Sequence, residues 1–197
     1  MKTTYLGLLS LAALASVTGC CMQSEASFPS QEELYDEPDA PDVLTVHSDN
    51  RSFSVKVDDA NLVGPDVQLS IYSEPSDRAV RGSLWGHPVS VDVGENVALG
   101  AVGTTPFKLA VHREGGAVHA SGSIQYRASD FTLARDRFTG KVADCRYDLH
   151  QTGSLTYEGE RSCNGPGVPI TMKIPNELSR WGDAGSAAAI ALLLSES

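Results

Sequence analysis

The sequence lacks the short motifs that mark most enzymes. It contains no Gly-x-Ser-x-Gly elbow, no Ser-x-x-Lys pair, no His-Glu-x-x-His motif and no glycine loop that would cradle a phosphate. Asp144 and Asp148 flank Arg146 at two-residue spacing, and this alternation of charge is typical of a solvated strand face rather than of an acid/base pair. We therefore favour a non-catalytic protein without a cofactor over a hydrolase whose site is not visible in the sequence.

Basic residues are also scarce. The chain has 15 Lys and Arg against 25 Asp and Glu, which gives a formal net charge of −10. Seven of the acidic residues lie between residues 22 and 42, while residues 43–197 hold 18 acidic and 14 basic side chains. The second part is only mildly acidic, which argues against electrostatic binding to nucleic acid or to anionic lipid.

The first nineteen residues have the pattern of an export signal. Lys2 supplies a positive charge, and the apolar run 5–15 is too short for a membrane helix, which needs ~20 apolar residues. The run leads to Val17-Thr18-Gly19-Cys20. This ending resembles the lipobox of bacterial lipoproteins. The resemblance implies that Cys20 receives a diacylglyceryl group and becomes the mature N-terminus when residues 1–19 are removed.

Cys21 is the alternative lipid site, but the triplet before it lacks the aliphatic residue of the lipobox, so we place the lipid on Cys20. Cys21 is then a second acylation site, an intermolecular partner or a residue without a role. By the lipoprotein sorting pattern, a residue other than aspartate after the lipidated cysteine implies the outer membrane in a diderm bacterium, or the plasma membrane in a monoderm. Two or three acyl chains would make this attachment to the cell envelope durable.

A tether is expected between the lipid and the domain. Residues 22–42 carry the seven acidic side chains, contain Pro29, Pro38 and Pro41, and have no Lys or Arg. Such a segment is expected to be disordered and self-repelling, with a root-mean-square span of about 25 Å. We therefore expect a lipidated cysteine and tether over residues 20–42 and a single β-rich domain over residues 43–197.

The domain sequence predicts a mainly β fold, an antiparallel β-sandwich or barrel with a short C-terminal helix. Short β-rich runs alternate with Gly, Pro, Asn and Asp, and no long amphipathic helix interrupts them. The expected strands are 43–47, 53–57, 67–72, 80–85, 89–93, 107–113, 118–126, 131–134, 141–150, 154–161 and 170–174. Asn176 is expected to cap a turn through Trp181, and Asp183 to cap a helix over 184–194 that lies on a sheet.

Two hairpins have a predicted register. Gly115-Gly116 suits a two-residue turn, which sets Phe107 opposite Ile124 and Val111 opposite Ala120. In the second hairpin, a loop at 151–153 sets Tyr147 opposite Tyr157 and Leu149 opposite Leu155.

Cys145 and Cys163 are expected to form a disulfide, because an exported protein reaches an oxidising compartment. Such a bond would add ~3 kcal/mol to stability. The second hairpin register conflicts with it, because Cys145 then faces Gly159, four residues or ~13 Å from Cys163. Either the chain folds back at 162–167 or one of the two predictions is wrong.

The first hairpin also places His112 opposite His119, where two imidazoles could share a metal ion. A third ligand would have to come from His47, His87, His150 or a carboxylate, and none has helpful spacing. Solvated histidines on the polar face of the hairpin are therefore the favoured interpretation.

The segment 130–138 mixes aromatic residues with arginine, a composition that interfaces favour. Phe131, Arg135, Arg137 and Phe138 are the candidate residues of a binding edge, and a strand followed by a charged turn is the alternative. The function that we expect is a membrane-anchored scaffold or binding domain. Its partner would be another envelope protein or a hydrophobic ligand, and a carrier of a lipid or metal ion remains a second interpretation.

Overall fold

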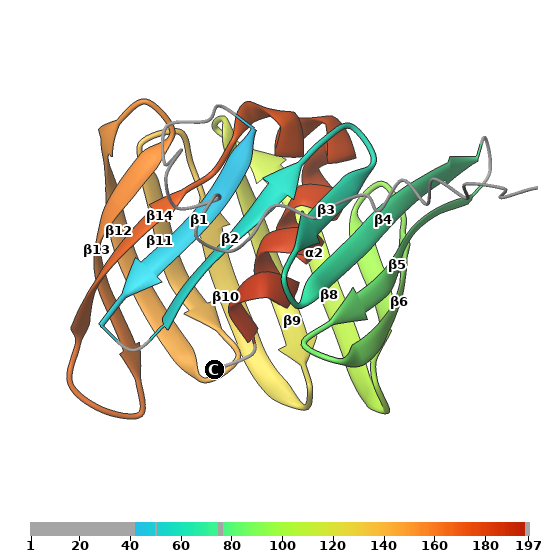
Figure 1. Cartoon of the computed structure of the whole chain (residues 1–197), viewed down its shortest axis with the longest axis horizontal. Coiled ribbons are helices and arrows are strands. Elements are labelled where there is room, and N and C mark those ends of the chain that lie inside the picture. The colour runs from blue at the N-terminus through green and yellow to red at the C-terminus, as the bar shows by residue number, and fades with distance from the viewer. Residues whose placement is uncertain (1–41, 50, 75–76, 196–197) are drawn as a thin grey trace, which may run out of the picture.

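The computed structural model describes residues 42–49, 51–74 and 77–195, which form a closed antiparallel β-barrel (Figure 1). Each strand pairs with the next in chain order, and β14 pairs with β1 to close the barrel. The strands are β1 (Val43–Ser48), β2 (Arg51–Val57), β3 (Asn61–Gly64), β4 (Val67–Glu74), β5 (Asp77–Leu84), β6 (His87–Val93), β7 (Val97–Val102), β8 (Thr105–Glu114), β9 (Ala117–Ile124), β10 (Arg127–Leu133), β11 (Arg137–Val142), β12 (Cys145–Gly153), β13 (Thr156–Cys163) and β14 (Val168–Lys173). The mainly β class is confirmed, and the barrel is the architecture that the chain adopts.

The strands alternate between buried apolar and exposed polar side chains, as a barrel wall requires. On β8, Phe107, Leu109 and Val111 are buried, whereas Lys108 and His112 are exposed. The same alternation along β12 buries Tyr147 and Leu149 and exposes the charged residues between them. The apolar side chains therefore point into the barrel and the charged ones point out.

Glycines recur along the odd-numbered strands from β3 to β13. A Cβ atom at any of them would lie only 1.9 to 2.8 Å from a backbone oxygen of the preceding strand. These glycines are Gly64, Gly82, Gly100, Gly122, Gly140 and Gly159. From β5 onward each pairs with a buried apolar residue, as Gly82 does with Leu69 and Gly122 with Leu109. Glycine at these places lets neighbouring backbones approach closely and lets the wall curve.

The C-terminal helix α2 (Gly182–Ser195) lies inside the barrel (Figure 1). Its residues from Ala184 to Ser195 are all buried, and the helix has no polar face. A helix that is apolar on every side must be buried on every side, and only the lumen offers this. The helix packs mainly against β8, β9 and β7, so it lies closer to that part of the wall.

Bulky side chains fill the part of the lumen beside β10 to β12. Phe131 on β10 and Phe138 on β11 have ring centroids 5.7 Å apart, and the ring of Tyr147 on β12 lies 5.5 Å from that of Phe138. All three residues are fully buried. The wall that α2 contacts most carries small residues such as Ala98 and Val111 together with the larger Phe107. The inward side chains of both parts of the wall and the helix together fill the lumen.

The structure corrects several sequence expectations. The helix begins at Gly182 and ends at Ser195, and it lies in the lumen rather than on a sheet. The turn before it is the 3-10 helix η1 (Asn176–Trp181), which follows Pro175 and has no side-chain cap. Strands β3 and β7 were not predicted. The expected strand 141–150 is two strands, because the chain turns at Ala143, which has a φ of 49°.

The first hairpin register is confirmed, since Phe107 pairs with Ile124 and His112 with His119. The second is wrong. Tyr147 pairs with Arg161 and Leu149 with Gly159, because β12 runs on to Gly153 before the chain turns.

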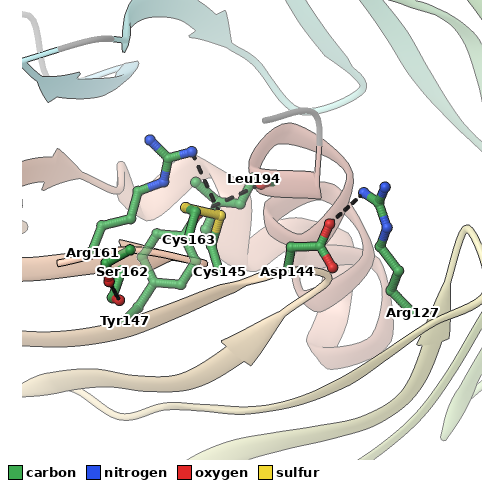
Figure 2. Close-up of a disulfide and its surroundings, with 9 residues drawn as sticks. Arg127, Asp144, Cys145, Tyr147, Arg161, Ser162, Cys163 and Leu194 are labelled. Atoms are coloured by element: carbon green, nitrogen blue, oxygen red, sulfur yellow. Dashed lines mark hydrogen bonds and ion pairs between the residues drawn. A yellow bond between two sulfur atoms is a disulfide. The ribbon is translucent and has the colours of Figure 1, made fainter. Parts of the chain in front are cut away.

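This shift of register removes the conflict over the disulfide. Cys145 and Cys163 are direct partners on β12 and β13, with Cα atoms 4.1 Å apart and an S–S bond of 2.04 Å (Figure 2). The predicted disulfide is therefore present. The bond lies beside the buried Arg161, whose Nη2 is 3.5 Å from the Sγ of Cys145.

The C-terminal end of α2 is held from two strands. Arg51 Nη2 on β2 donates a hydrogen bond of 2.8 Å to the carbonyl oxygen of Leu193. The hydroxyl of Tyr147 on β12 donates to the carbonyl oxygen of Leu194 at 3.5 Å (Figure 2). Burial raises the pKa of Tyr147, so this phenol remains a donor at neutral pH. These donors satisfy carbonyl groups that a helix leaves without partners at its C-terminus.

Candidate functional site

One end of the barrel is partly covered by η1, and we call this end the mouth. It is formed by the turns 58–60, 94–96, 115–116, 134–136 and 154–155, and β1 begins there. The chain leaves β14 at the mouth, forms η1 and then enters the lumen as α2 (Figure 1). Each of these segments carries polar groups, so the mouth combines exposed polar residues with access to the apolar lumen.

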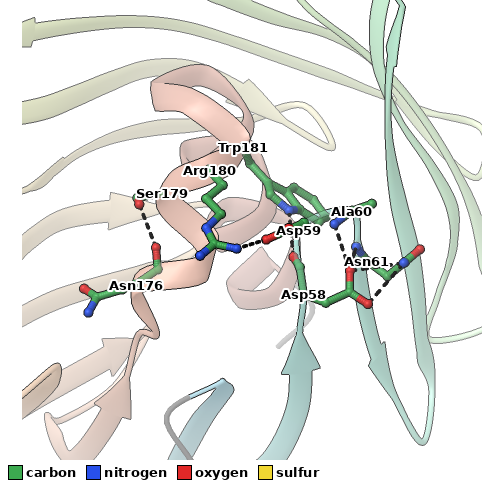
Figure 3. A network of polar contacts seen from close by, with 8 residues as sticks. All are labelled: Asp58, Asp59, Ala60, Asn61, Asn176, Ser179, Arg180 and Trp181. Carbon is green, nitrogen blue, oxygen red and sulfur yellow. Dashed lines mark hydrogen bonds and ion pairs between the residues drawn. The ribbon is translucent and has the colours of Figure 1, made fainter.

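The turn between β2 and β3 fixes one side of η1. The side chain of Arg180 forms an ion pair with Asp59, and the indole nitrogen of Trp181 donates to the carbonyl oxygen of Asp58 at 3.4 Å (Figure 3). The Asp58 carboxylate accepts hydrogen bonds from the backbone N–H groups of Ala60 (2.8 Å) and Asn61 (2.6 Å). Burial alone would raise the pKa of Asp58, but these hydrogen bonds bring it below its ordinary value.

A second polar contact joins the start of α2 to the wall. Arg113 on β8 donates to both carboxylate oxygens of Asp183, at 2.8 Å from Nε and 2.5 Å from Nη2. These hydrogen bonds lower the pKa of Asp183 and raise that of Arg113. The carboxylate also lies in the first turn of α2, where negative charge is favourable.

A hollow of about 540 Å³ opens between η1 and the turns of the β8–β13 wall, and we call it the mouth pocket. Its buried lining residues are apolar except for Ser186, and its exposed lining residues are mostly polar. The inner residues are Val118, Leu133, Leu155, Tyr157, Ile174 and Leu178. The outer residues include Arg113, Arg135, Gln151, Asn176, Ser179 and Asp183.

The position of α2 accounts for the mouth pocket. The helix packs mainly on the β7–β9 side, and the aromatic residues fill the lumen on the other side at greater depth. Near the mouth the hydroxyl of Tyr157 donates to the carbonyl oxygens of Ala134 (3.4 Å) and Arg135 (3.1 Å), which fixes the turn 134–136. Burial and the nearby carboxylate of Asp136 raise the pKa of Tyr157, so the hydroxyl keeps its proton.

Two further hollows lie beside the mouth pocket. One of about 780 Å³ is lined by Arg78, Glu95, His112 and Arg113 among others, and shares Asp183 with the mouth pocket. The other, of about 420 Å³, lies on the far side of η1 and is lined by three aspartates together with Glu177 and Arg180. Charged residues are numerous among the lining residues of both, whereas the mouth pocket is the hollow of these three that is lined by several large apolar side chains.

The structure brings His112 and His119 together on the outer face of β8 and β9. Their rings stack with centroids 5.1 Å apart and an interplanar angle of 15°. Nδ1 of His119 also lies 3.0 Å from the Oγ1 of Thr132 on β10. Within residues 42–49, 51–74 and 77–195, no three His, Cys, Asp or Glu side chains gather into a possible metal site.

The four residues of the predicted binding edge do not share a surface. Phe131 and Phe138 are buried in the lumen, Arg137 pairs with Asp148 on the outer face at 2.9 Å, and Arg135 lies at the mouth. A closed barrel has no free edge at β10 and β11, since each pairs on both sides. Arg135 is thus the member of this group that lines a hollow. The lipidation residue Cys20 lies outside the described residues.

Sequence reasoning missed the apolar base of the mouth pocket. Leu133 ends strand β10, Leu155 lies in the turn before β13 and Leu178 lies in η1, and none stands in a recognisable motif. In the structure Leu155 stands out by its backbone, because its φ of 63° is uncommon for a bulky side chain.

Comparisons with protein-family models, with curated proteins and with solved structures found no match to this chain. In the part of the chain that the structure describes, no helix has the length and apolar character needed to cross a bilayer.

Proposed function

We propose that the chain is a lipid-anchored lipoprotein of the cell envelope whose barrel is a non-catalytic binding domain. The lipobox at residues 17–20 provides the anchor, and Cys20 carries the lipid. The sorting pattern at Cys21 favours the outer membrane as its location. The observation that carries the binding role is the mouth pocket, which has an apolar base and a polar rim, whereas α2 and buried aromatic side chains fill the lumen below it.

The outer surface of the barrel supports an aqueous setting for the domain. Charged and polar side chains such as Lys108, Asp148 and His150 point outward from the middle of their strands. A barrel wall in contact with lipid tails instead carries an apolar band about 25 Å tall. The lipid on Cys20, rather than the barrel wall, is therefore the proposed attachment to the membrane.

The position of Asp42 supports a role for the mouth in binding near the membrane. Its carbonyl oxygen accepts a hydrogen bond of 2.7 Å from the N–H of Val57, and its side chain lines the hollow beside η1. The proposed tether therefore joins the domain at the mouth. A tether of about twenty residues gives the mouth a reach of about 25 Å from its lipid anchor.

The chemistry of the hollows favours binding over catalysis. The mouth pocket is lined by Asp183 and serine hydroxyls but by no histidine, and the neighbouring hollow is lined by His112 and carboxylates but by no Ser, Thr, Cys or Lys. A hydrolase site would need a nucleophile, a base and an orienting group in one place.

Acylation is tested by comparing Cys20→Ala with Cys21→Ala in the full chain. We expect intact-mass analysis to find lipid on the wild type and on Cys21→Ala, and both proteins to sediment with membranes. Cys20→Ala should lose both properties. A wild-type protein without acyl mass, or lipid loss caused by Cys21→Ala alone, would contradict the anchor.

Binding at the mouth is tested by photo-crosslinking in intact envelopes. A photoreactive amino acid at Gln151, an exposed residue on the rim of the mouth pocket, should capture a reproducible partner or lipid, whereas the same amino acid at Lys141 on the outer face of β11 should not. Equal capture at the two positions, or capture at neither, would argue against a binding site at the mouth.

A further inference from the structure

The mouth pocket has a polarity gradient that matches a particular kind of ligand. Val118, Ile174 and Leu178 at its base are at most 8% exposed, and Leu133 and Leu155 above them are half-buried. Gln151 and Asn176 on its rim are exposed. A molecule that fits this gradient has an apolar part that enters first and a polar part that stays at the rim.

The rim also has a definite charge. Arg113, Arg135 and Asp183 are the charged residues that line the pocket. Asp183 is neutralised by its two hydrogen bonds with Arg113, whereas Arg135 forms no ion pair with any described residue. Asp136 follows Arg135 in the turn but does not line the pocket. The charged side chains that line the pocket therefore sum to one positive charge, which favours an anionic group.

The volume and the place of the pocket narrow the ligand further. A hollow of about 540 Å³ has the size of a site for a small molecule rather than for a folded domain. The pocket opens at the mouth, the end of the barrel at which Asp42 and hence the proposed tether lie. A lipid-anchored chain would therefore hold this opening within reach of membrane amphiphiles.

We propose that the mouth pocket binds a single-chain amphiphile with an anionic head group. Its acyl chain lies on Val118, Leu133, Leu155, Ile174 and Leu178, and its head group accepts hydrogen bonds from Arg135. The inference rests on the proposed function, since it identifies the ligand of the same pocket. It depends on the local charge of the rim and not on the net charge of the domain.

The test uses a fatty acid with a diazirine in its chain and a free carboxylate. It is added to the full-chain protein in proteoliposomes, irradiated, and located in the protein by peptide mapping. We expect labelling to concentrate on the peptides that contain Leu133, Leu155 and Leu178. Arg135→Glu should reduce this labelling about tenfold through loss of charge-assisted hydrogen bonds.

Leu155→Asp should reduce labelling by at least as much, because it places a carboxylate against the acyl chain. Aspartate tolerates the positive φ of this position better than leucine does, so the variant should fold. The matched controls are Leu99→Asp and Arg137→Glu on the outer face, which should leave labelling unchanged. Labelling spread over the outer face, or equal loss in variants and controls, would overturn the proposal.

Two further experiments complete the test. The first distinguishes a free fatty acid from a membrane lipid as the ligand, and the second distinguishes the anchor proposal from the ligand proposal. A diazirine lysophospholipid with an anionic head group, placed in the vesicles, tests a single-chain membrane lipid against the free acid; labelling at the pocket by either probe supports the inference, and labelling by neither overturns it. Cys20→Ala without vesicles should still be labelled by the fatty acid. Loss of acylation would then refute the anchor alone, and loss of pocket labelling would refute the ligand alone.

Discussion

The guanidinium of Arg113 and the carboxylate of Asp183 join the barrel wall to the first turn of the helix that fills it. Two hydrogen bonds, of 2.8 and 2.5 Å, link the groups. The contact lies where the chain enters the lumen, so it fixes the point at which α2 leaves η1. It also forms one side of the mouth pocket and neutralises the acidic group there.

Asp183→Asn should lower stability at neutral pH by ~0.5–1 kcal/mol, a value kept small because the side chains of Arg113 and Asp183 are 54% and 32% exposed. The folded-state pKa of Asp183 is depressed, so its contribution is present above the unfolded-state pKa and is lost as pH falls through the folded-state pKa. The gap between wild type and variant in urea unfolding should therefore be full at pH 7 and shrink progressively as pH falls below the ordinary pKa of an aspartate. A gap that does not shrink on acidification would show that the ion pair is not its cause.

Gly100→Ala tests the close approach of strands in the wall. The new Cβ would lie 2.0 Å from the carbonyl oxygen of Ser90 on β6, so the backbone would have to move. We expect a loss of about 3 kcal/mol in the free energy of unfolding, as for other severe overpacking. The matched control is Gly153→Ala, whose Cβ would meet nothing nearer than 3.8 Å and whose effect should stay within about 0.5 kcal/mol. Equal effects of the two substitutions would contradict a steric role for the wall glycines.

Strand register could be predicted from the sequence where a turn contains residues with a known turn preference, and was mispredicted where it does not. Gly115-Gly116 identified its turn, and the register of β8 and β9 followed correctly. The turn at Ser154-Leu155 uses a leucine with a φ of 63°, which no residue preference indicates, so the loop was placed too early and the register was wrong. For the same reason the turn at Ala143 was missed and two strands were merged.

The candidate site was less predictable because its parts are distant in sequence. Arg135 was singled out by the local mixture of aromatic residues and arginine, but its role was assigned to a strand edge that barrel closure removes. The apolar base requires β9, β10, β13 and η1 to meet at one end of the barrel. That meeting depends on insertion of α2 into the lumen. The helix is apolar on every side, which indicates full burial but does not indicate which strands meet around its N-terminal end.

Ala188→Leu tests how tightly α2 fits the lumen. Ala188 is 0% exposed in the middle of the helix, so the added volume has no solvent to occupy. The substitution should destabilise by about 1–3 kcal/mol even though leucine is a good helix former. Ala110→Leu adds the same atoms on the exposed face of β8 and should change stability by less than about 0.5 kcal/mol. Thermal unfolding compares the two, and an unchanged midpoint for Ala188→Leu would mean that the lumen has unfilled space around the helix.

Arg51 is expected to stabilise the C-terminal end of α2 by its positive charge and by the planar shape of its guanidinium group. Its guanidinium carbon lies 5.0 Å from the ring centroid of Phe53 and 5.5 Å from that of Trp85, while Nη2 holds the carbonyl oxygen of Leu193. Arg51→Met should cost about 2 kcal/mol, because it removes a cation from a helix C-terminus and a donor from a buried carbonyl. Arg51→Lys keeps the charge but loses the planar stacking, so its cost should be intermediate.

The control variant Arg127→Met breaks an exposed ion pair with Asp144 at the same end of the barrel and should cost less than about 0.5 kcal/mol. If chemical unfolding ranks Arg51→Met with Arg127→Met, the helix end is held by apolar packing alone and the arginine has no stabilising role there.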